Sequence, residues 1–222
     1  MDRWINALAN SVIPPESIIT HQPLLSVHAP NHVGFCLIYP NHVTLPALLS
    51  YPINKIARRA PVLIFTESEL QGTVDCYPIE CLEMVRTETV RFGSSIRPLI
   101  DVEPADLRLE IESNCRRNLI LLRQHAWRNP FGLAKILRAS MGQLIQTIKY
   151  VPSLNHRAMI EPVENADLNL IATILELDTE KLTRLSVLLF KLHNPSMWRQ
   201  LAEEYLDLVT HVVAKIDSFN VS

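Results

Sequence analysis

Three acidic residues in the segment 74–85 carry side chains that could bind a metal ion. Asp75, Glu80 and Glu83 are the acids nearest to the predicted sheet, and we expect the segment itself to form a strand. Asp75 and Glu83 are separated by an even number of residues, so a regular strand would place both carboxylates on one face. The alternative is structural: Asp75 would position a turn, and Glu80 would pair with an arginine. We favour the structural role, because isolated acids are rarely catalytic sites.

A long stretch before these residues contains no acid. Between Ser17 and Thr66 the chain has neither Asp nor Glu, and its ionisable side chains include histidines. Imidazole rings can bind zinc, but the spacing of these histidines matches no compact zinc motif. We therefore expect hydrogen-bonded or solvent-facing rings and no metal site. The histidines are His21, His28, His32 and His42.

The densest group of basic side chains lies after Cys115 and could meet a phosphate or a nucleic-acid strand. Its members are Arg116, Arg117, Arg123, Arg128, Lys135 and Arg138, with His125 and Trp127 beside them. In a helix, Glu110 and Glu112 would lie close enough to these basic residues to form salt bridges. The chain as a whole has a net charge of -2. A solvated helix face with ion pairs is therefore the favoured interpretation, and nucleic acid is not an expected partner.

The elements that would position these side chains change in kind at Pro104. Before it, prolines divide the chain into short segments, and strands alternating with helices favour a mixed or parallel sheet. Thr66 and Glu69 form a predicted capping box at a helix start. The other expected elements are a helix over 3–8, strands over 24–28, 33–39 and 61–65, and a helix within 45–59.

Beyond Pro104 the hydrophobic period is that of amphipathic helices, which predicts an antiparallel bundle. The expected helices cover 105–127, 131–150, 165–177, 179–192 and 195–219. The first would carry one apolar face, made of Leu107, Ile111, Cys115, Leu119, Leu122 and Ala126. The predicted fold is therefore α+β, with a sheet domain over residues 1–104 and an all-α helical bundle domain over 105–222.

The cysteines and the apolar runs indicate the compartment in which we expect the protein. The four cysteines form no CxxC pair and no apolar signal segment opens the chain, so we expect reduced thiols in the cytoplasm. The longest apolar runs are far shorter than the roughly twenty residues of a membrane span, so no membrane partner is expected.

Two blocks of sequence resemble a branch of the nucleotidyltransferase-like superfamily. The run from Thr66 to Met84, TESELQGTVDCYPIECLEM, is similar to that branch's LT-x-x-EL-x-x-x-x-D-V-F-P-I-E-F-L-D-I stretch, and Phe92-Gly93 follows at the expected distance. The second block is similar to its LR-x-x-x-E-x-x-L-R-x-K-L-L-x-LR helix. It is carried by Leu107, Arg108, Glu112, Arg116, Leu119, Leu122 and Arg123. The resemblance covers most of the chain from Val33 onward and implies a small nucleotidyltransferase-type sheet domain followed by a helical domain.

The same resemblance implies that the catalytic motif is missing. Active members hold the triphosphate on a Gly-Ser turn and bind magnesium through an Asp-x-Asp pair. Here the first glycine of the chain is Gly34, and His32 and Gly34 stand where the paired carboxylates would be. Neither can replace an anionic oxygen ligand of Mg2+. The resemblance thus implies a degenerate member that takes neither Mg2+ nor a nucleoside triphosphate as a cofactor.

Three functional hypotheses follow. The leading one is a catalytically inactive binding or scaffold protein, whose partner is a protein or a small molecule. The second is a Mg-dependent nucleotidyltransferase with a rearranged site built from Asp75, Glu80 and Glu83. The third is a structural homo-oligomer that associates through apolar bundle faces. We also expect Glu80 or Glu83 to pair with Arg116 or Arg123 between the domains.

Overall fold

The structure is a computed structural model, and it describes residues 15–21, 34–40, 61–128, 132–155, 168–191 and 197–219. The chain divides into two compact units, Met1–Val102 and Glu103–Ser222. The described strands all belong to the first unit, and the described part of the second is helical. None of the described helices combines the length and apolar composition that a membrane span requires.

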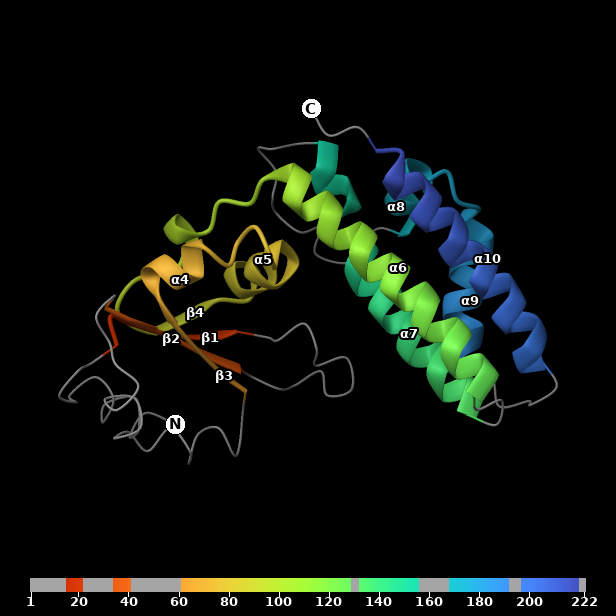
Figure 1. Ribbon diagram of the computed structural model, residues 1–222, viewed down its shortest axis with the longest axis horizontal. Coiled ribbons are helices and arrows are strands. Elements are labelled where there is room, and N and C mark those ends of the chain that lie inside the picture. Colours follow the sequence, from red (N-terminus) through yellow and green to blue (C-terminus); the bar gives the residue numbers. More distant parts are fainter. Residues whose placement is uncertain are drawn as a thin grey trace. The chain divides into compact units, whose positions relative to one another are not determined.

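The first unit is built on a mixed sheet. Its elements are β1 (Ser17–His21), β2 (Gly34–Tyr39), β3 (Val62–Thr66), α4 (Glu67–Gln71), α5 (Pro78–Arg86), β4 (Thr89–Phe92) and the 3-10 turn η2 (Arg97–Leu99). The four described strands lie in the order β3-β2-β1-β4. β2 pairs parallel with β3, whereas β1 pairs antiparallel with β2 and β4. α5 packs on β1, and α4 and α5 lie on the same side of the sheet (Figure 1). The predicted α+β class is confirmed at this level, and the nucleotidyltransferase-type fold stays a prediction.

Two of the predicted strands are confirmed. β2 and β3 coincide with the runs expected over 33–39 and 61–65 to within a residue at each end. Every residue of β2 is buried, which explains why this strand is an unbroken apolar run rather than an alternating one. The strand expected over 24–28 and the helices expected over 3–8 and within 45–59 fall outside the described residues. β1 and β4 have no counterpart among the predicted strands.

The capping box at the start of α4 is also confirmed. The Oγ1 atom of Thr66 accepts a hydrogen bond from the backbone N–H of Glu69 at 3.2 Å. In return, the backbone N–H of Thr66 donates to Oε2 of Glu69 at 2.8 Å. Two backbone donors at the start of the helix are thus satisfied, and β3 passes directly into α4.

The strand predicted over 74–85 is wrong. The chain makes a turn there, and the helix α5 begins at Pro78. Proline is favoured in the first turn of a helix, because its φ angle suits the helix and its missing N–H would have no partner there. Asp75 and Glu83 therefore do not share the face of a strand, and the geometric argument for a metal site between them no longer holds.

A single glycine lets β4 leave the sheet beside β1. Gly93 follows β4 with a φ of 78°, a conformation that side chains disfavour. A Cβ atom at this position would lie 1.9 Å from the backbone oxygen of Glu16. The position therefore requires glycine for both its backbone angle and its close approach to the segment that begins β1.

The second unit is a bundle of helices. Its elements are α6 (Pro104–Arg128), α7 (Leu133–Ile148), the 3-10 turn η4 (Val151–Asn155), α8 (Leu168–Ile174), α9 (Thr179–Lys191) and α10 (Trp198–Asp217). They confirm the helices expected in this region, with ends shifted by a few residues. α6 packs along both α7 and α10, and α7 runs back beside α6 in the opposite direction (Figure 1).

The predicted apolar face of α6 is confirmed over most of its length. Leu107, Ile111, Cys115 and Leu122 are buried, whereas Leu119 is half-buried. The side chain of Ala126 falls outside the description. This face turns α6 toward the bundle core and leaves the opposite face of the helix outward.

Candidate functional site

The three candidate acids do not gather into one site. Asp75 is exposed in the turn before α5, and Glu80 is half-buried in the first turn of that helix. Glu83 is only 3% exposed. Its Oε2 atom accepts hydrogen bonds from Nη2 of Arg86 at 2.6 Å and from Nε at 3.1 Å. Glu83 is therefore held by an ion pair within its own helix.

The histidine hypothesis can be followed at one position. His21 is buried in β1, and His28, His32 and His42 fall outside the described residues. Within the described ranges, no three His, Cys, Asp or Glu side chains come together as a metal site would require.

Two of the buried thiols, those of Cys36 and Cys115, are poor nucleophiles. Burial, together with the nearby Cys81 and Glu88, raises the pKa of Cys36 to about 12. Burial alone raises the pKa of Cys115 to about 12. Because the thiolate is the reactive form, neither side chain is suited to nucleophilic catalysis near neutral pH.

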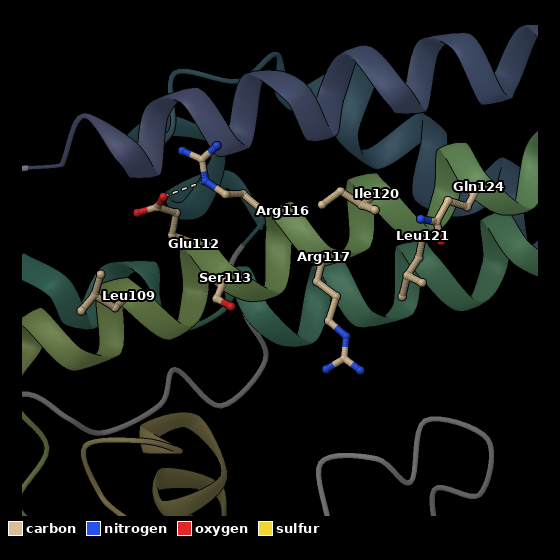
Figure 2. Close-up of a pocket in the computed structure, with 8 residues that line it drawn as sticks. All are labelled: Leu109, Glu112, Ser113, Arg116, Arg117, Ile120, Leu121 and Gln124. Carbon is tan, nitrogen blue, oxygen red and sulfur yellow. Dashed lines mark hydrogen bonds and ion pairs between the residues drawn. The ribbon is translucent and has the colours of Figure 1, made fainter.

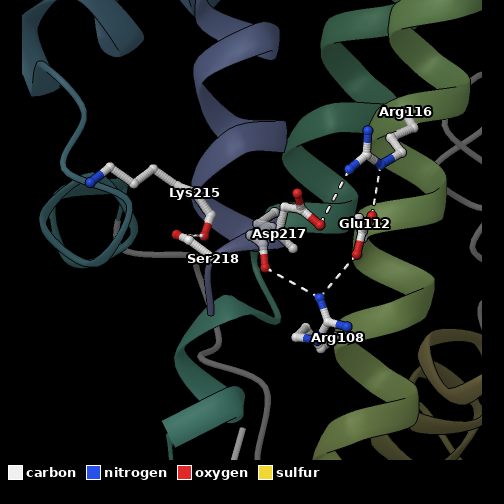
Figure 3. Close-up of polar contacts among 7 residues, drawn as sticks. Arg108, Glu112, Arg116, Lys215, Asp217 and Ser218 are labelled. Atoms are coloured by element: carbon white, nitrogen blue, oxygen red, sulfur yellow. Dashed lines mark hydrogen bonds and ion pairs between the residues drawn. The ribbon is translucent and has the colours of Figure 1, made fainter. Parts of the chain in front are cut away.

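Part of the predicted basic stretch forms an ion-pair network between α6 and the end of α10 (Figure 3). Glu112 accepts hydrogen bonds from Nη1 of Arg108 at 2.9 Å and from Nε of Arg116 at 2.7 Å. Nη2 of Arg116 lies 3.3 Å from Oδ1 of Asp217. Nη1 of Arg108 also donates to the backbone oxygen of Ile216 at 3.5 Å. Cations are favourable at this end of α10, because the carbonyl end of a helix carries partial negative charge.

The network keeps its groups charged. The hydrogen bond from Arg116 holds the pKa of Glu112 below its usual value, despite partial burial, and the charges of Arg116 and Arg108 act in the same direction. The same hydrogen bond raises the pKa of Arg116. Neither group changes protonation near neutral pH, so the pair cannot serve as a general acid or base there. Its role is to hold α6 against α10.

The other residues of the predicted basic stretch do not share one role. The guanidinium of Arg138 on α7 lies 5.1 Å from the ring centre of Trp198 on α10, a distance typical of cation–π contacts. Arg117, Arg123 and Lys135 are exposed. The side chains of His125, Trp127 and Arg128 fall outside the description. The charge pairs expected between Glu80 or Glu83 and Arg116 or Arg123 stay a prediction.

The outward side of α6 carries apolar side chains that the bundle does not cover. We define the outer face as Leu109, Ser113, Arg116, Arg117, Ile120 and Leu121, which line a surface pocket together with Glu112 and Gln124 (Figure 2). Leu109 and Ile120 are each 53% exposed, and Leu121 is 37% exposed. Exposed apolar side chains that share a pocket with polar ones are a feature of interaction surfaces.

One cation of the outer face has no ion-pair partner among the described residues. Figure 2 shows Arg117 pointing away from Glu112 and Arg116, on the other side of the helix. Arg117 is exposed, and every described ion pair of α6 joins other residues. The outer face therefore offers apolar contact and an exposed guanidinium, which is a combination suited to binding rather than to catalysis.

No protein-family model matches this sequence, and no curated protein or solved structure is significantly similar to it. The resemblance to the nucleotidyltransferase-like superfamily therefore stays a prediction from the two sequence blocks, and the function must be argued from the chain's own residues.

Sequence reasoning missed the outer face. The period that identified the buried face of α6 left Leu109, Ile120 and Leu121 unassigned. Leu109 and Ile120 are eleven residues apart, which returns to nearly the same side of a helix after three turns. This eleven-residue spacing is the feature of the sequence that could have predicted the outer face.

Proposed function

We propose that this chain is a degenerate relative of the nucleotidyltransferase-like superfamily that acts by binding a partner and does not transfer nucleotides. The family resemblance supports the ancestry. The stretch from Ser17 to Thr66 supplies no carboxylate for a metal pair, and Glu83 is engaged by Arg86. A two-metal mechanism needs several anionic ligands at one point, so these observations support binding over catalysis.

The outer face of α6 is the observation that carries the proposal. It exposes three large apolar side chains on one helix, where an isolated chain gains nothing from exposing them. Small-molecule sites are concave and surround most of their ligand, whereas the described residues that line the pocket of the outer face all come from one helix and leave its other sides open. The partner is therefore a protein, and an α-helix is the element that packs most readily along another helix.

An activity assay tests the negative half of this proposal. The purified chain is incubated with the four ribonucleoside triphosphates and with Mg2+ or Mn2+, and pyrophosphate release is followed. The expected result is no release above a protein-free control. Release that depends on the protein and is lost in Asp75→Ala or Glu80→Gln would instead favour the magnesium-dependent enzyme with a rearranged site.

A further inference from the structure

The outer side of α6 carries a heptad pattern along its middle. We define the seam as Asp106, Leu109, Ser113, Arg116, Ile120 and Arg123, which are spaced alternately by three and four residues. This spacing keeps side chains in line along one side of a helix that packs against another helix. Leu109, Ser113, Arg116, Ile120 and Arg123 are exposed and Asp106 is half-buried, so the seam is outward over its whole length.

We infer that a second copy of this chain docks on the seam, with the two α6 helices antiparallel and related by a two-fold axis. The inference rests on the proposed function, because it names the partner of the same surface. It commits to a second copy because the seam is complementary to itself when its direction is reversed.

The apolar positions match in that arrangement. With the axis level with the step from Asn114 to Cys115, Leu109 of one chain faces Ile120 of the second copy, and symmetry repeats this contact. Both side chains are more than half exposed in the single chain. Packing them against each other removes apolar surface from water at two points on either side of the axis.

The charged positions match in the same register. Asp106 of each chain faces Arg123 of the second copy, so two acid–base pairs close the ends of the seam. Neither residue has an ion-pair partner among the described residues of its own chain. Complementary charges at the edges of helix pairs set their orientation.

The centre of the seam allows close approach. Ser113 faces Arg116 of the second copy on both sides of the axis. Arg116 directs its guanidinium toward Asp217 and Glu112 (Figure 3), so it presents mainly its methylene stem to the small serine. Small side chains at a helix crossing let the backbones approach.

Charge also disfavours the parallel orientation. In a parallel in-register pair, Asp106 would face Asp106, and Arg116 and Arg123 would each face their own kind. Like charges directly opposite one another are unfavourable. The antiparallel arrangement replaces the contacts at both ends with attractive ones.

Light scattering after size exclusion gives the first test. The expected mass of the wild-type chain is twice 25.3 kDa at micromolar concentration, falling toward a single chain on dilution. Ile120→Glu should give a single-chain mass at every concentration tested. The matched control Leu170→Glu changes a residue that is 42% exposed on α8, away from the seam, and should remain dimeric.

Complementation between two charge variants tests the register. Asp106→Arg alone places two basic residues together at both ends, and Arg123→Asp alone places two acids together. Each should raise the dimer dissociation constant about tenfold, since two exposed pairs are reversed. An equal mixture of the two variants restores an acid–base pair at both ends and should dimerise like the wild type, which also shows that both variants are folded.

Three outcomes would overturn the inference: a single-chain mass for the wild type up to 100 μM (about the upper range for a specific weak dimer), a dimer unaffected by Ile120→Glu, or variants that fail to complement. A helical partner of another kind, or another segment of the same chain on the seam, would give the first of these. None of these three outcomes involves pyrophosphate release. The mass measurements therefore test the dimer, and the pyrophosphate assay separately tests the proposed function.

Discussion

Asn118 on α6 and Ser140 on α7 exchange two hydrogen bonds in the interior of the second unit. Nδ2 of Asn118 donates to the backbone oxygen of Ser140 at 2.9 Å, and Oγ of Ser140 donates to Oδ1 of Asn118 at 2.5 Å. The hydroxyl of Tyr205 on α10 lies 2.9 Å from the same Oγ. All three side chains are buried, so one polar cluster links the helices that hold α6 in place.

Asn118→Ala should lower the free energy of unfolding by about 2 kcal/mol, because it leaves buried polar groups without their partner. Chemical denaturation followed by circular dichroism measures the loss. The control Asn114→Ala changes a half-buried asparagine of the same helix and should cost less than about 0.5 kcal/mol. Equal losses in the two variants would show that the cluster contributes nothing specific.

Gly93→Ala should be severely destabilising, by about 3 kcal/mol or more, because a side chain is disfavoured at its φ angle and would overlap the backbone of Glu16. Gly72→Ala is the matched control. Its added Cβ would lie 3.3 Å from the nearest oxygen, at an ordinary φ of -72°, so a change within about 1 kcal/mol is expected. Thermal unfolding compares the two, and similar melting temperatures would contradict the prediction.

The ion pairs of Glu112 should make stability depend on pH. Since Arg116 holds the folded-state pKa of Glu112 below its unfolded value, the stabilisation is complete above about pH 4.3 and is lost as pH falls through the folded pKa. Glu112→Gln should therefore cost about 1 kcal/mol at pH 7 and progressively less below about pH 4. Denaturation at several pH values checks this, and a pH-independent difference would refute it.

Glu176 should tolerate glycine better than alanine. It follows α8 with a φ of 52°, which costs a side chain about 1 kcal/mol relative to glycine. Both Glu176→Gly and Glu176→Ala remove the exposed ion pair with Lys215, so the comparison isolates the backbone. The glycine variant should be more stable by about 1 kcal/mol. A less stable glycine variant would contradict the strain argument.

Local signals in the sequence predicted several elements correctly. Thr66 and Glu69 predicted a helix start because a capping box is a contact between neighbours in the chain, independent of the rest of the fold. The face with Leu107 and Ile111 likewise identified the inward side of α6, since burial along a helix repeats with the helical period.

The error over 74–85 had a local cause of another kind. Most residues around Pro78 are apolar, and a short run of mainly apolar residues cannot be distinguished from a buried strand by its pattern alone. Proline at the start of a helix costs nothing, whereas in a strand it removes a ladder hydrogen bond, and this preference decided the structure. If the segment had been assigned as a helix, the three-residue spacing of Glu83 and Arg86 would have predicted their ion pair.

The polar cluster and the outer face depend on more distant relationships. Asn118 is buried because Ser140 and Tyr205 satisfy it, and they are 22 and 87 residues away in the chain. Leu109 and Ile120 are outward because α7 and α10 cover the other side of α6. Periodicity indicates which residues share a face, but tertiary packing determines which face is covered.

Calorimetric titration of the chain with ATP in the presence of Mg2+ tests the central claim, that this protein binds a partner and does not handle nucleotides. The account predicts no saturable heat up to millimolar ATP, because a doubly charged ion without anionic ligands does not recover its hydration energy. Asp75→Ala and Glu80→Gln are the informative variants, since Glu83 is buried and ion-paired with Arg86, and its loss would disturb the fold. Saturable binding at micromolar ATP that either variant abolishes would contradict the account.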